Sequence, residues 1–381
     1  MSNKARVIAF YLPQFHPTEI NDKYWGKGFT EWTNVAKAKP LYKGHYQPQI
    51  PADLGFYDLR VPEVREAQAE MARNAGVEGF CYWNYWFGNG EKILEMPIEK
   101  VIETAQPDFP FCIGWANHDW SNKTWIKSSG FQKDVVFLKQ KYLGVQDYEL
   151  YFEYLLPMFK DDRYITVEGK PLFYVFDPDA IPDTTVFIDT FNKKAVENGF
   201  PGIYFVCRAD PIGQFGIHNE ENFLNARAEK RYKNYMKMGY DAVNSFSFRR
   251  AEVLSNGIWN RAWRKLRLII TKSSMMDYDY LKIVENLYMK EDEWENVFPT
   301  VCPRKDRTPR SGKNAWLYRD STPEKFRIGL RLALEKLEKK PYERKILFLD
   351  SWNEWGEGAY MEPDIKFKNE YLDVLKAEVM D

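Results

Sequence analysis

The sequence predicts an α/β fold, a single (β/α)8 barrel of the TIM type over residues 1–381. Eight short apolar runs alternate along the chain with segments of helical periodicity, which is the pattern of a βα repeat. The runs are apolar throughout rather than at every second position, as expected of parallel strands covered on both faces. A length of 381 residues accommodates one such barrel with insertions, and no linker or repeat divides it. A doubly wound parallel sheet is the alternative.

The eight expected strands follow one another at spacings that leave room for a helix between most pairs. Each is a short apolar run bounded by turn or loop residues. In chain order the runs are Ala5–Leu12, Val77–Trp86, Phe109–Ala116, Pro171–Asp177, Gly202–Arg208, Asp241–Phe246, Val297–Cys302 and Ile346–Ser351.

Four intervening segments carry clear helix signals. The segment 58–75 has Pro62 near its first turn and Gly76 as a stop, and 185–198 ends at Gly199. The segment 147–159 gathers aromatic and leucine side chains on one face, and Thr322-Pro323 opens a helix with an apolar stripe that ends at Leu337.

Three connections are longer than a βα unit requires. They follow the first, third and sixth expected strands, at residues 13–59, 117–146 and 247–296. Loops that follow barrel strands build the functional face, so these insertions are expected to serve a site.

Composition limits the classes of function. A formal net charge of −1 gives no sign of a nucleic-acid partner. The four Cys and four His show no metal-ligand spacing, so neither a metal nor another cofactor is expected. The first residues do not resemble a secretory signal, and no apolar run is long enough to cross a bilayer. Buried free thiols and a soluble, cytoplasmic protein are therefore expected.

Polar and aromatic residues collect at the ends of the expected strands. In a barrel these ends meet at one face, where hydrogen bonds and flat apolar rings together can hold a sugar. Core packing is the alternative for each aromatic residue. The candidates for binding substrate are Tyr11, Gln14, His16, Trp32, Tyr82, Trp83, Tyr85, Trp86, Asn117, Trp120, Asp177 and Arg208.

The eighth expected strand is followed by two carboxylates three residues apart, Glu354 and Glu357. Trp352, Asn353 and Trp355 surround them and join the candidate binding residues. Two carboxylates whose surroundings separate their pKa values can serve as acid and base on one bond. A turn with two solvated glutamates is the alternative interpretation, and the spacing alone leaves the stereochemical outcome open.

Two basic segments and one acidic pair have alternative interpretations. The basic loop 301–310 can grip a phosphate, a uronate or the strand-eight carboxylates through Arg307 or Arg310, or it is simply solvated. The segment 249–267 is expected to form a helix packed on the barrel, with contact to an anionic membrane as the weaker alternative. Asp177-Pro178-Asp179 is expected to be a strand-end turn rather than a metal site.

Five separated motifs together resemble the WbsX-type family, whose members are described as glycosyltransferases of O-antigen or capsule synthesis. That family is itself similar to glycoside hydrolase family 99, the endo-α-mannosidases. The motifs are Phe10–His16, Gly28–Trp32, Tyr82–Trp86, Asp306–Arg310 and Trp352–Gly358.

The resemblance implies a (β/α)8 barrel and a retaining reaction on an α-linked, mannose-like glycan. It assigns Glu354 as the base that deprotonates a sugar 2-hydroxyl and Glu357 as the acid that protonates the leaving oxygen. Two alternatives accompany this prediction. One is a glycosyltransferase of O-antigen or capsular polysaccharide synthesis that uses a nucleotide sugar or a lipid-linked sugar. The other is a glycan-binding barrel without catalysis.

Overall fold

Eight parallel strands close into a barrel, as predicted. In the computed structural model, which describes residues 3–121, 135–211, 220–271 and 273–380, the strands hydrogen-bond in the order β1, β2, β4, β8, β9, β10, β12 and β14, and β14 pairs with β1 to close the ring. Their bounds are β1 Arg6–Tyr11, β2 Val77–Trp86, β4 Phe111–Trp115, β8 Lys170–Val175, β9 Tyr204–Ala209, β10 Ala242–Ser245, β12 Val297–Val301 and β14 Ile346–Leu349. Each lies within or at the edge of an expected run.

Side chains fill the inside of the barrel, so its centre is core rather than a channel. Phe10 stacks on Trp83 at 4.8 Å and on Phe348 at 5.2 Å between ring centroids, and Tyr174 meets Phe10 edge-on. Large aromatic rings from four strands thus close the interior below its mouth. A binding site must therefore lie above this layer, at the ends of the strands.

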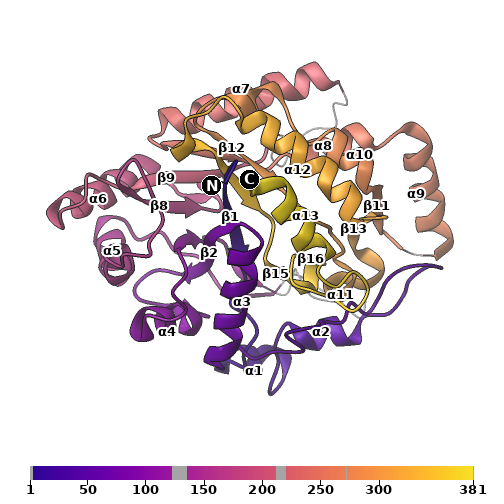
Figure 1. Cartoon of the computed structure of the whole chain (residues 1–381), viewed down its shortest axis with the longest axis horizontal. Helices are drawn as coiled ribbons and strands as arrows, with labels where there is room; N and C mark the ends of the chain where they lie inside the picture. The colour runs from indigo at the N-terminus through magenta and orange to yellow at the C-terminus, as the bar shows by residue number, and fades with distance from the viewer. Residues whose placement is uncertain (1–2, 122–134, 212–219, 272, 381) are drawn as a thin grey trace.

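Helices cover the outside of the barrel (Figure 1). Local capping explains where several begin: Asp183 accepts the Val186 N–H ahead of α6, and Thr322 accepts the Lys325 N–H ahead of α12. The bounds are α1 Glu19–Trp25, α2 Trp32–Lys37, α3 Pro62–Asn74, α4 Met96–Thr104, α5 Val145–Phe159, α6 Thr184–Glu197, α7 Glu221–Lys237, α8 Phe248–Ser255, α9 Ile258–Thr271, α10 Tyr280–Glu285, α11 Thr308–Ser311, α12 Pro323–Leu337 and α13 Glu370–Val379. The four predicted helices correspond to α3, α5, α6 and α12.

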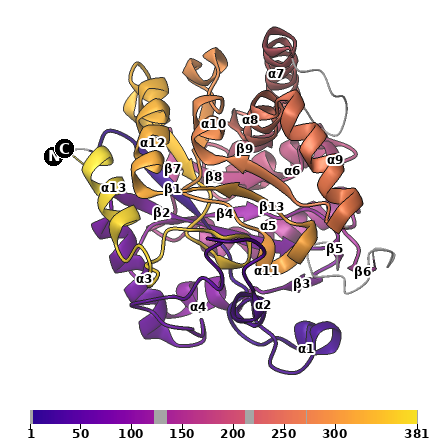
Figure 2. The ribbon, with the colours of Figure 1, turned by 90° about the vertical axis from the view of Figure 1, so that its right-hand side faces the viewer.

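The long connections carry extra elements toward the carboxyl ends of the strands. In Figure 2 the chain termini lie at the left, whereas α9, α11 and the β5–β6 hairpin lie toward the right. The extra strands are β3 Lys92–Ile93, β5 Trp120–Ser121, β6 Val136–Leu138, β7 Thr166–Val167, β11 Met276–Asp279, β13 Trp316–Arg319, β15 Asn353–Glu354 and β16 Ala359–Tyr360. Single 3-10 turns are η2 Pro178–Ala180, η3 Lys290–Glu293, η4 Gly312–Asn314, η5 Tyr342–Arg344 and η6 Trp355–Glu357. Residues 122–134 of the connection after β4 lie outside the described residues.

The basic segment after β10 forms two helices, α8 and α9, separated near Gly257. Helix α9 packs through its charged side, because Arg267 Nη1 lies 2.9 Å from Asp277 Oδ1 of β11 and Arg264 also faces that carboxylate. Trp263 and Ile269 of the same helix are mostly exposed. The side chain of Trp259 lies outside the described residues. None of the described helices has both the length and the apolar character of a membrane span. The four cysteines are buried and unpaired, as expected.

Candidate active site

A cavity of about 730 Å³ opens at the carboxyl end of the barrel. Residues at or beyond the ends of all eight barrel strands line it: Gln14, Tyr85, Asn117, Asp177, Arg208, Phe246, Lys305 and Asp350. Ten of the residues predicted from the sequence lie on this wall, namely Gln14, Trp83, Tyr85, Asn117, Trp120, Asp177, Arg208, Arg310, Glu354 and Glu357. The structure thus brings together residues that are up to 343 positions apart in the chain.

A second cavity of about 770 Å³ lies beside the first, and Lys305 borders both. Tyr42, His45 and Arg319 are among its lining residues, but neither glutamate is. Because the paired carboxylates open only into the first cavity, the candidate active site is assigned there.

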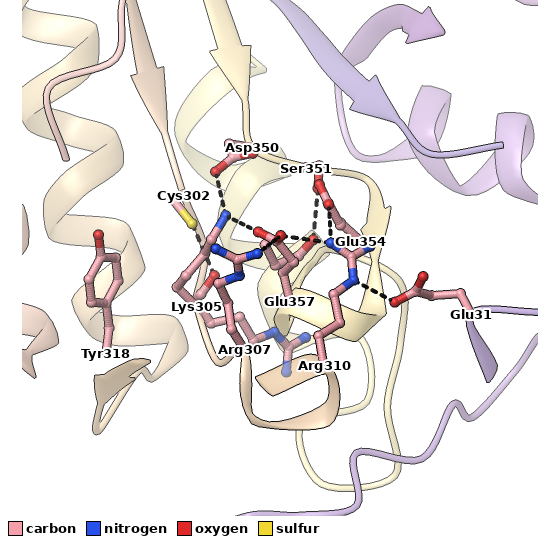
Figure 3. A network of polar contacts seen from close by, with 12 residues as sticks. Glu31, Cys302, Lys305, Arg307, Arg310, Tyr318, Asp350, Ser351, Glu354 and Glu357 are labelled. Carbon is pink, nitrogen blue, oxygen red and sulfur yellow. Dashed lines mark hydrogen bonds and ion pairs between the residues drawn. The ribbon is translucent and has the colours of Figure 1, made fainter. Parts of the chain in front are cut away.

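Arg310 of α11 joins the two glutamates (Figure 3). Its Nη1 lies 3.0 Å from Glu354 Oε1 and 2.7 Å from Glu357 Oε1, while its Nε donates to Glu31 Oε1 at 2.8 Å. A guanidinium has donors in a fixed plane, so one arginine can hold three carboxylates in a defined arrangement. The expectation that this loop grips the strand-eight carboxylates is confirmed for Arg310, and for Arg307 on Glu357.

Glu357 has more cationic partners than Glu354. Lys305 Nζ lies 3.0 Å from Glu357 Oε2, and Arg307 Nη2 lies 3.1 Å from Glu357 Oε1. Lys305 also reaches Asp350 at 3.3 Å. Among the described residues, the one ion pair of Glu354 is its shared contact with Arg310, so the two carboxylates occupy electrostatically different positions.

The pKa values of the two glutamates move in opposite directions. Burial first, and then the charge of Glu357, raises the pKa of Glu354 to about 7. Burial would also raise the pKa of Glu357, but Arg307, Lys305 and Arg310 together lower it well below its usual range. At neutral pH Glu357 is therefore ionised, and Glu354 is the member of the pair able to hold a proton.

A tight hairpin explains why the two glutamates point to the same arginine. β15 pairs with β16, and η6 forms the turn between them, so Glu354 and Glu357 stand at the two ends of one turn. Gly358 closes that turn at φ +58, in the left-handed region that favours glycine. A Cβ at this position would lie 2.8 Å from the Asp306 nitrogen, so the basic loop can approach only a glycine.

Aromatic rings form much of the remaining wall. Trp83, Tyr85, Trp120, Tyr142 and Trp316 all line the cavity. Tyr85 meets Trp120 edge-on at 5.2 Å, which fixes the orientation of both rings. Flat apolar faces beside carboxylates and amides are what a sugar ring requires.

Three predicted residues on the strands lie on the outer side of the barrel wall, and their expected placement in the cleft is corrected. The Tyr11 hydroxyl donates to Gln68 of α3, Tyr82 packs 4.5 Å from Tyr11, and Trp86 stacks on Tyr151 of α5 at 4.8 Å. Successive side chains of a strand face opposite sides, so Trp83 faces inward while its neighbour Tyr82 faces outward.

The other predicted residues outside the cavity support it from behind. Trp352 is fully buried, and Trp355 stacks on Tyr360 at 3.6 Å. Asn353 bonds the backbone of Leu12 through both ends of its amide. For these three residues the expected contact with the cleft is likewise corrected, because the hairpin turns them into the core.

Trp32 and His16 also lie outside the cavity, and their expected placement is corrected too. The Trp32 indole donates to the Tyr57 carbonyl and packs 5.4 Å from Trp355. His16 is buried, and this burial lowers its pKa to about 4 although the charge of Asp58 acts in the opposite direction. Both residues belong to the connection after β1, which packs under the hairpin of the glutamates.

The sequence analysis did not single out three charged members of the site: Glu31, Lys305 and Asp350. All three stand inside or beside the motifs that carry the family resemblance. The loops after strands seven and eight commonly hold charged ligands in barrels, and this could have indicated Lys305 and Asp350. Glu31 lies 279 positions from Arg310 and carried no signal of its own.

Among the described residues, no three His, Cys, Asp or Glu side chains gather in a way that could hold a metal ion. In Asp177-Pro178-Asp179, the Asp179 carboxylate pairs with Arg231 at 2.6 Å. Asp177 alone lines the cavity, which agrees with the strand-end turn expected for this pair.

Comparison with known proteins identifies the family of this chain. The family described as Glycosyltransferase WbsX matches residues 7–375. The uncharacterized protein WxcX from two strains of Xanthomonas campestris pv. campestris is 31% identical over 373 residues, which are 98% of this chain and 49% of that protein. The chain thus spans about half the length of the curated relatives it matches.

Solved structures share the fold at low sequence identity. A glycoside hydrolase-like protein is 16% identical, with a TM-score of 0.60 over 99% of this chain and 94% of that one. The GH99 endo-α-mannosidase from Bacteroides thetaiotaomicron is 14% identical, with a TM-score of 0.54 over 99% of this chain and 96% of that one. With its family match running through nearly every strand of the barrel, the chain belongs to the WbsX glycosyltransferase family of carbohydrate-active enzymes.

Proposed function

We propose that the chain moves a glycosyl unit by a retaining, two-glutamate reaction in the cavity at the barrel mouth. The observation that carries the proposal is the shared grip of Arg310 on Glu354 and Glu357. The two bound oxygens lie 3.0 and 2.7 Å from one nitrogen, so the two carboxylates approach each other closely on the side that faces Arg310. Carboxyl groups lie closer together in retaining enzymes, at about 5–5.5 Å, than in inverting enzymes, at about 6.5–9.5 Å, and a shared arginine favours the closer arrangement.

Charge balance supports giving the proton to Glu354. Three cations of the site, Lys305, Arg307 and Arg310, face four carboxylates, those of Glu31, Asp350, Glu354 and Glu357 (Figure 3). One proton makes the cluster neutral. Glu357 receives three of the cationic contacts, whereas Glu354 shares its single arginine with two other carboxylates.

In this mechanism Glu354 is the acid and base. It donates its proton to the leaving oxygen as the bond from that oxygen to the sugar C1 breaks, and the Glu357 carboxylate bonds to C1 from the opposite face. Glu354 then takes a proton from water or from an acceptor hydroxyl, whose oxygen displaces Glu357. Two inversions restore the original configuration.

These roles exchange those that the family resemblance implied. A carboxylate whose charge is shared among three cations is a weak base, so it is poorly suited to removing a proton from a sugar hydroxyl. It is well suited to staying ionised and stabilising positive charge at C1. The raised pKa of Glu354 near neutrality fits the acid.

The substrate class and the acceptor are part of the proposal. A solved structure with the same fold is called an endo-α-mannosidase, which supports an α-linked, mannose-like sugar. The family's name supports transfer to a sugar acceptor over hydrolysis. A nucleotide sugar or a lipid-linked sugar would then be the donor, in the synthesis of a surface polysaccharide such as O-antigen. A glycan-binding barrel without catalysis is less well supported, because it would not need two carboxylates with separated pKa values.

Glu354→Gln and Glu357→Gln, assayed with two α-mannosides, test the assignment. A 2,4-dinitrophenyl leaving group needs no proton, whereas a methoxide leaving group does. The loss of kcat/KM caused by Glu354→Gln should therefore be roughly 100-fold smaller with the dinitrophenyl glycoside than with the methyl glycoside. Glu357→Gln should cleave neither. With 5-fluoro-α-mannosyl fluoride, mass spectrometry should find the sugar attached to the peptide that contains Glu357.

Two results would count against this assignment. If the dinitrophenyl glycoside rescues Glu357→Gln and not Glu354→Gln, the two glutamates have the roles implied by the resemblance. Inversion at C1, followed by NMR of the first product, excludes the retaining route. Stabilisation by a nucleotide sugar in a thermal-shift panel, without turnover of any α-mannoside, would identify that nucleotide sugar as the donor, and the two variants would then be assayed with it.

A further inference from the structure

Arg208 is a cation in the cavity that differs from its neighbours in having no carboxylate partner. It stands near the end of β9, and its Cζ lies 4.5 Å from the ring centroid of Phe176 and 3.9 Å from that of Phe246. Its Nε is buried and makes no hydrogen bond within the part of the chain that the structure describes. The guanidinium is thus held between two rings that leave its hydrogen-bonding groups unused.

The other cations of the cavity are neutralised by the protein. Lys305, Arg307 and Arg310 each contact at least one carboxylate within 3.3 Å. No ion pair of this kind exists between Arg208 and any residue among those described. The charge of Arg208 acts on the Asp177 carboxylate, but that carboxylate accepts the backbone N–H groups of Asp179 and Ala180 in its own turn.

Keeping a charged group unpaired at the bottom of a cleft is costly. Contact with two aromatic faces contributes about 0.5–2 kcal/mol, which is less than an arginine gains from a paired carboxylate or phosphate in a desolvated site. An arginine offers five N–H donors, and two ring contacts satisfy none of them. The arrangement does supply one advantage, since a guanidinium already fixed between rings loses little freedom when a ligand binds.

We propose that Arg208 binds an anionic group of the substrate, so that the sugar handled in this cavity carries a carboxylate or a phosphate. This inference rests on the proposed function, because it takes the cavity to be a glycosyl site. β9 and β14 are separated in the barrel by β10 and β12, so Arg208 stands three strands around the mouth from the strand that leads to the two glutamates. The bound anion therefore belongs to a part of the glycan away from the bond that reacts.

Binding to an inactive protein tests the inference without turnover. The variant Glu354→Gln, which leaves the Glu357 carboxylate paired with Lys305, Arg307 and Arg310, is titrated by calorimetry with mannose, mannuronate and mannose 6-phosphate, with acetate and inorganic phosphate as probes of the bare anions. At least one charged sugar should bind roughly 30-fold or more tighter than mannose, since charge-assisted hydrogen bonds contribute about 1.5–3 kcal/mol. Which of the two binds tighter distinguishes a uronate from a phosphorylated sugar.

Arg208→Met in the same background should remove this preference and leave the binding of mannose unchanged. Arg208→Lys should keep part of it, because the charge remains while the planar fork is lost. Arg249→Met is the matched control, since Arg249 is an exposed arginine that does not line the cavity. Far-UV circular dichroism and urea unfolding establish that each variant is folded.

Two results would overturn the inference: equal binding of neutral and charged sugars by Glu354→Gln, or a preference for charged sugars that survives when Arg208→Met is added to it. Neither depends on catalysis. If Glu354→Gln shows the preference but the wild type turns over no glycoside, the proposed reaction fails while the anion site stands.

Discussion

Glu31 occupies the space that a side chain on Gly356 would need. A Cβ built on Gly356 would lie 1.5 Å from Glu31 Oε1 and 2.9 Å from Arg310 Nε. Glu31 comes from the connection after the first strand, and Gly356 lies in the turn between the two glutamates. Glu31 can therefore reach Arg310 only because Gly356 has no side chain. The site depends on this absence as much as on its charged groups.

Gly356→Ala should disrupt the site through contact alone. Gly356 does not have the left-handed backbone that would itself disfavour alanine. The new methyl group must displace the Glu31 carboxylate, and overpacking of a buried site costs about 1–3 kcal/mol. We expect that loss in urea unfolding and at least a tenfold loss of kcat/KM. Gly257→Ala is the control, since no atom lies within 4 Å of its added Cβ. Equal behaviour of the two variants would contradict the role given to Glu31.

Arg310→Lys should reduce activity more than a conservative change normally does. An ammonium cannot reproduce the planar grip on Glu31, Glu354 and Glu357, and a displacement of about 1 Å at a reacting group costs roughly 100-fold in rate. Unfolding free energy should fall by about 3 kcal/mol, because Glu31 is buried and loses its partner.

Adding Glu31→Gln to Arg310→Lys separates the two effects. The neutral amide removes the unpaired buried charge, so the double variant should recover stability without recovering turnover. Thermal unfolding and kcat, measured on the same preparations, check this. Recovery of both would mean that Arg310 serves stability alone.

The barrel was predictable from the sequence because its strands are buried on both faces. Continuous apolar runs such as Ile346–Leu349 identify a parallel strand with little ambiguity. The same property hid which side chains face the cavity. In β2, Tyr82 and Trp83 are both aromatic, and nothing in their identity tells the inner face from the outer one. Alternation gives the faces only after the register of the strand is known.

The charged core of the site was predictable only in part. The spacing of Glu354 and Glu357 identified the pair, and the basic loop offered Arg310 as a partner for it. The unequal sharing of cations between the two glutamates depends on where Lys305 and Arg307 lie in space. Local sequence carries no information about that, so the direction of each pKa shift had to come from the structure.

Trp83 and Trp352 should respond differently to replacement by phenylalanine. Trp83 lines the cavity, so Trp83→Phe should raise KM roughly tenfold and lower the unfolding free energy by about 1 kcal/mol or less. Trp352 is fully buried outside it, so Trp352→Phe should leave KM unchanged and cost about 2 kcal/mol of stability. Steady-state kinetics and urea unfolding of both variants test this division. A raised KM in Trp352→Phe would indicate that Trp352 contacts the substrate after all.

The pH dependence of turnover should show a basic limb and no acidic limb from this pair. Glu354 must hold a proton to act as the acid, and its pKa is raised to about 7. kcat/KM should therefore decrease about tenfold for each pH unit above 7. Glu357 must be ionised, and its lowered pKa keeps it so throughout the weakly acidic range. No loss of activity from protonation of Glu357 is expected on going down to about pH 5.

The dinitrophenyl glycoside tests whether the basic limb comes from Glu354. Its leaving group needs no proton, so the first step of its cleavage should not show the basic limb. A limb of equal steepness with both leaving groups would place the titration near pH 7 on a group other than Glu354.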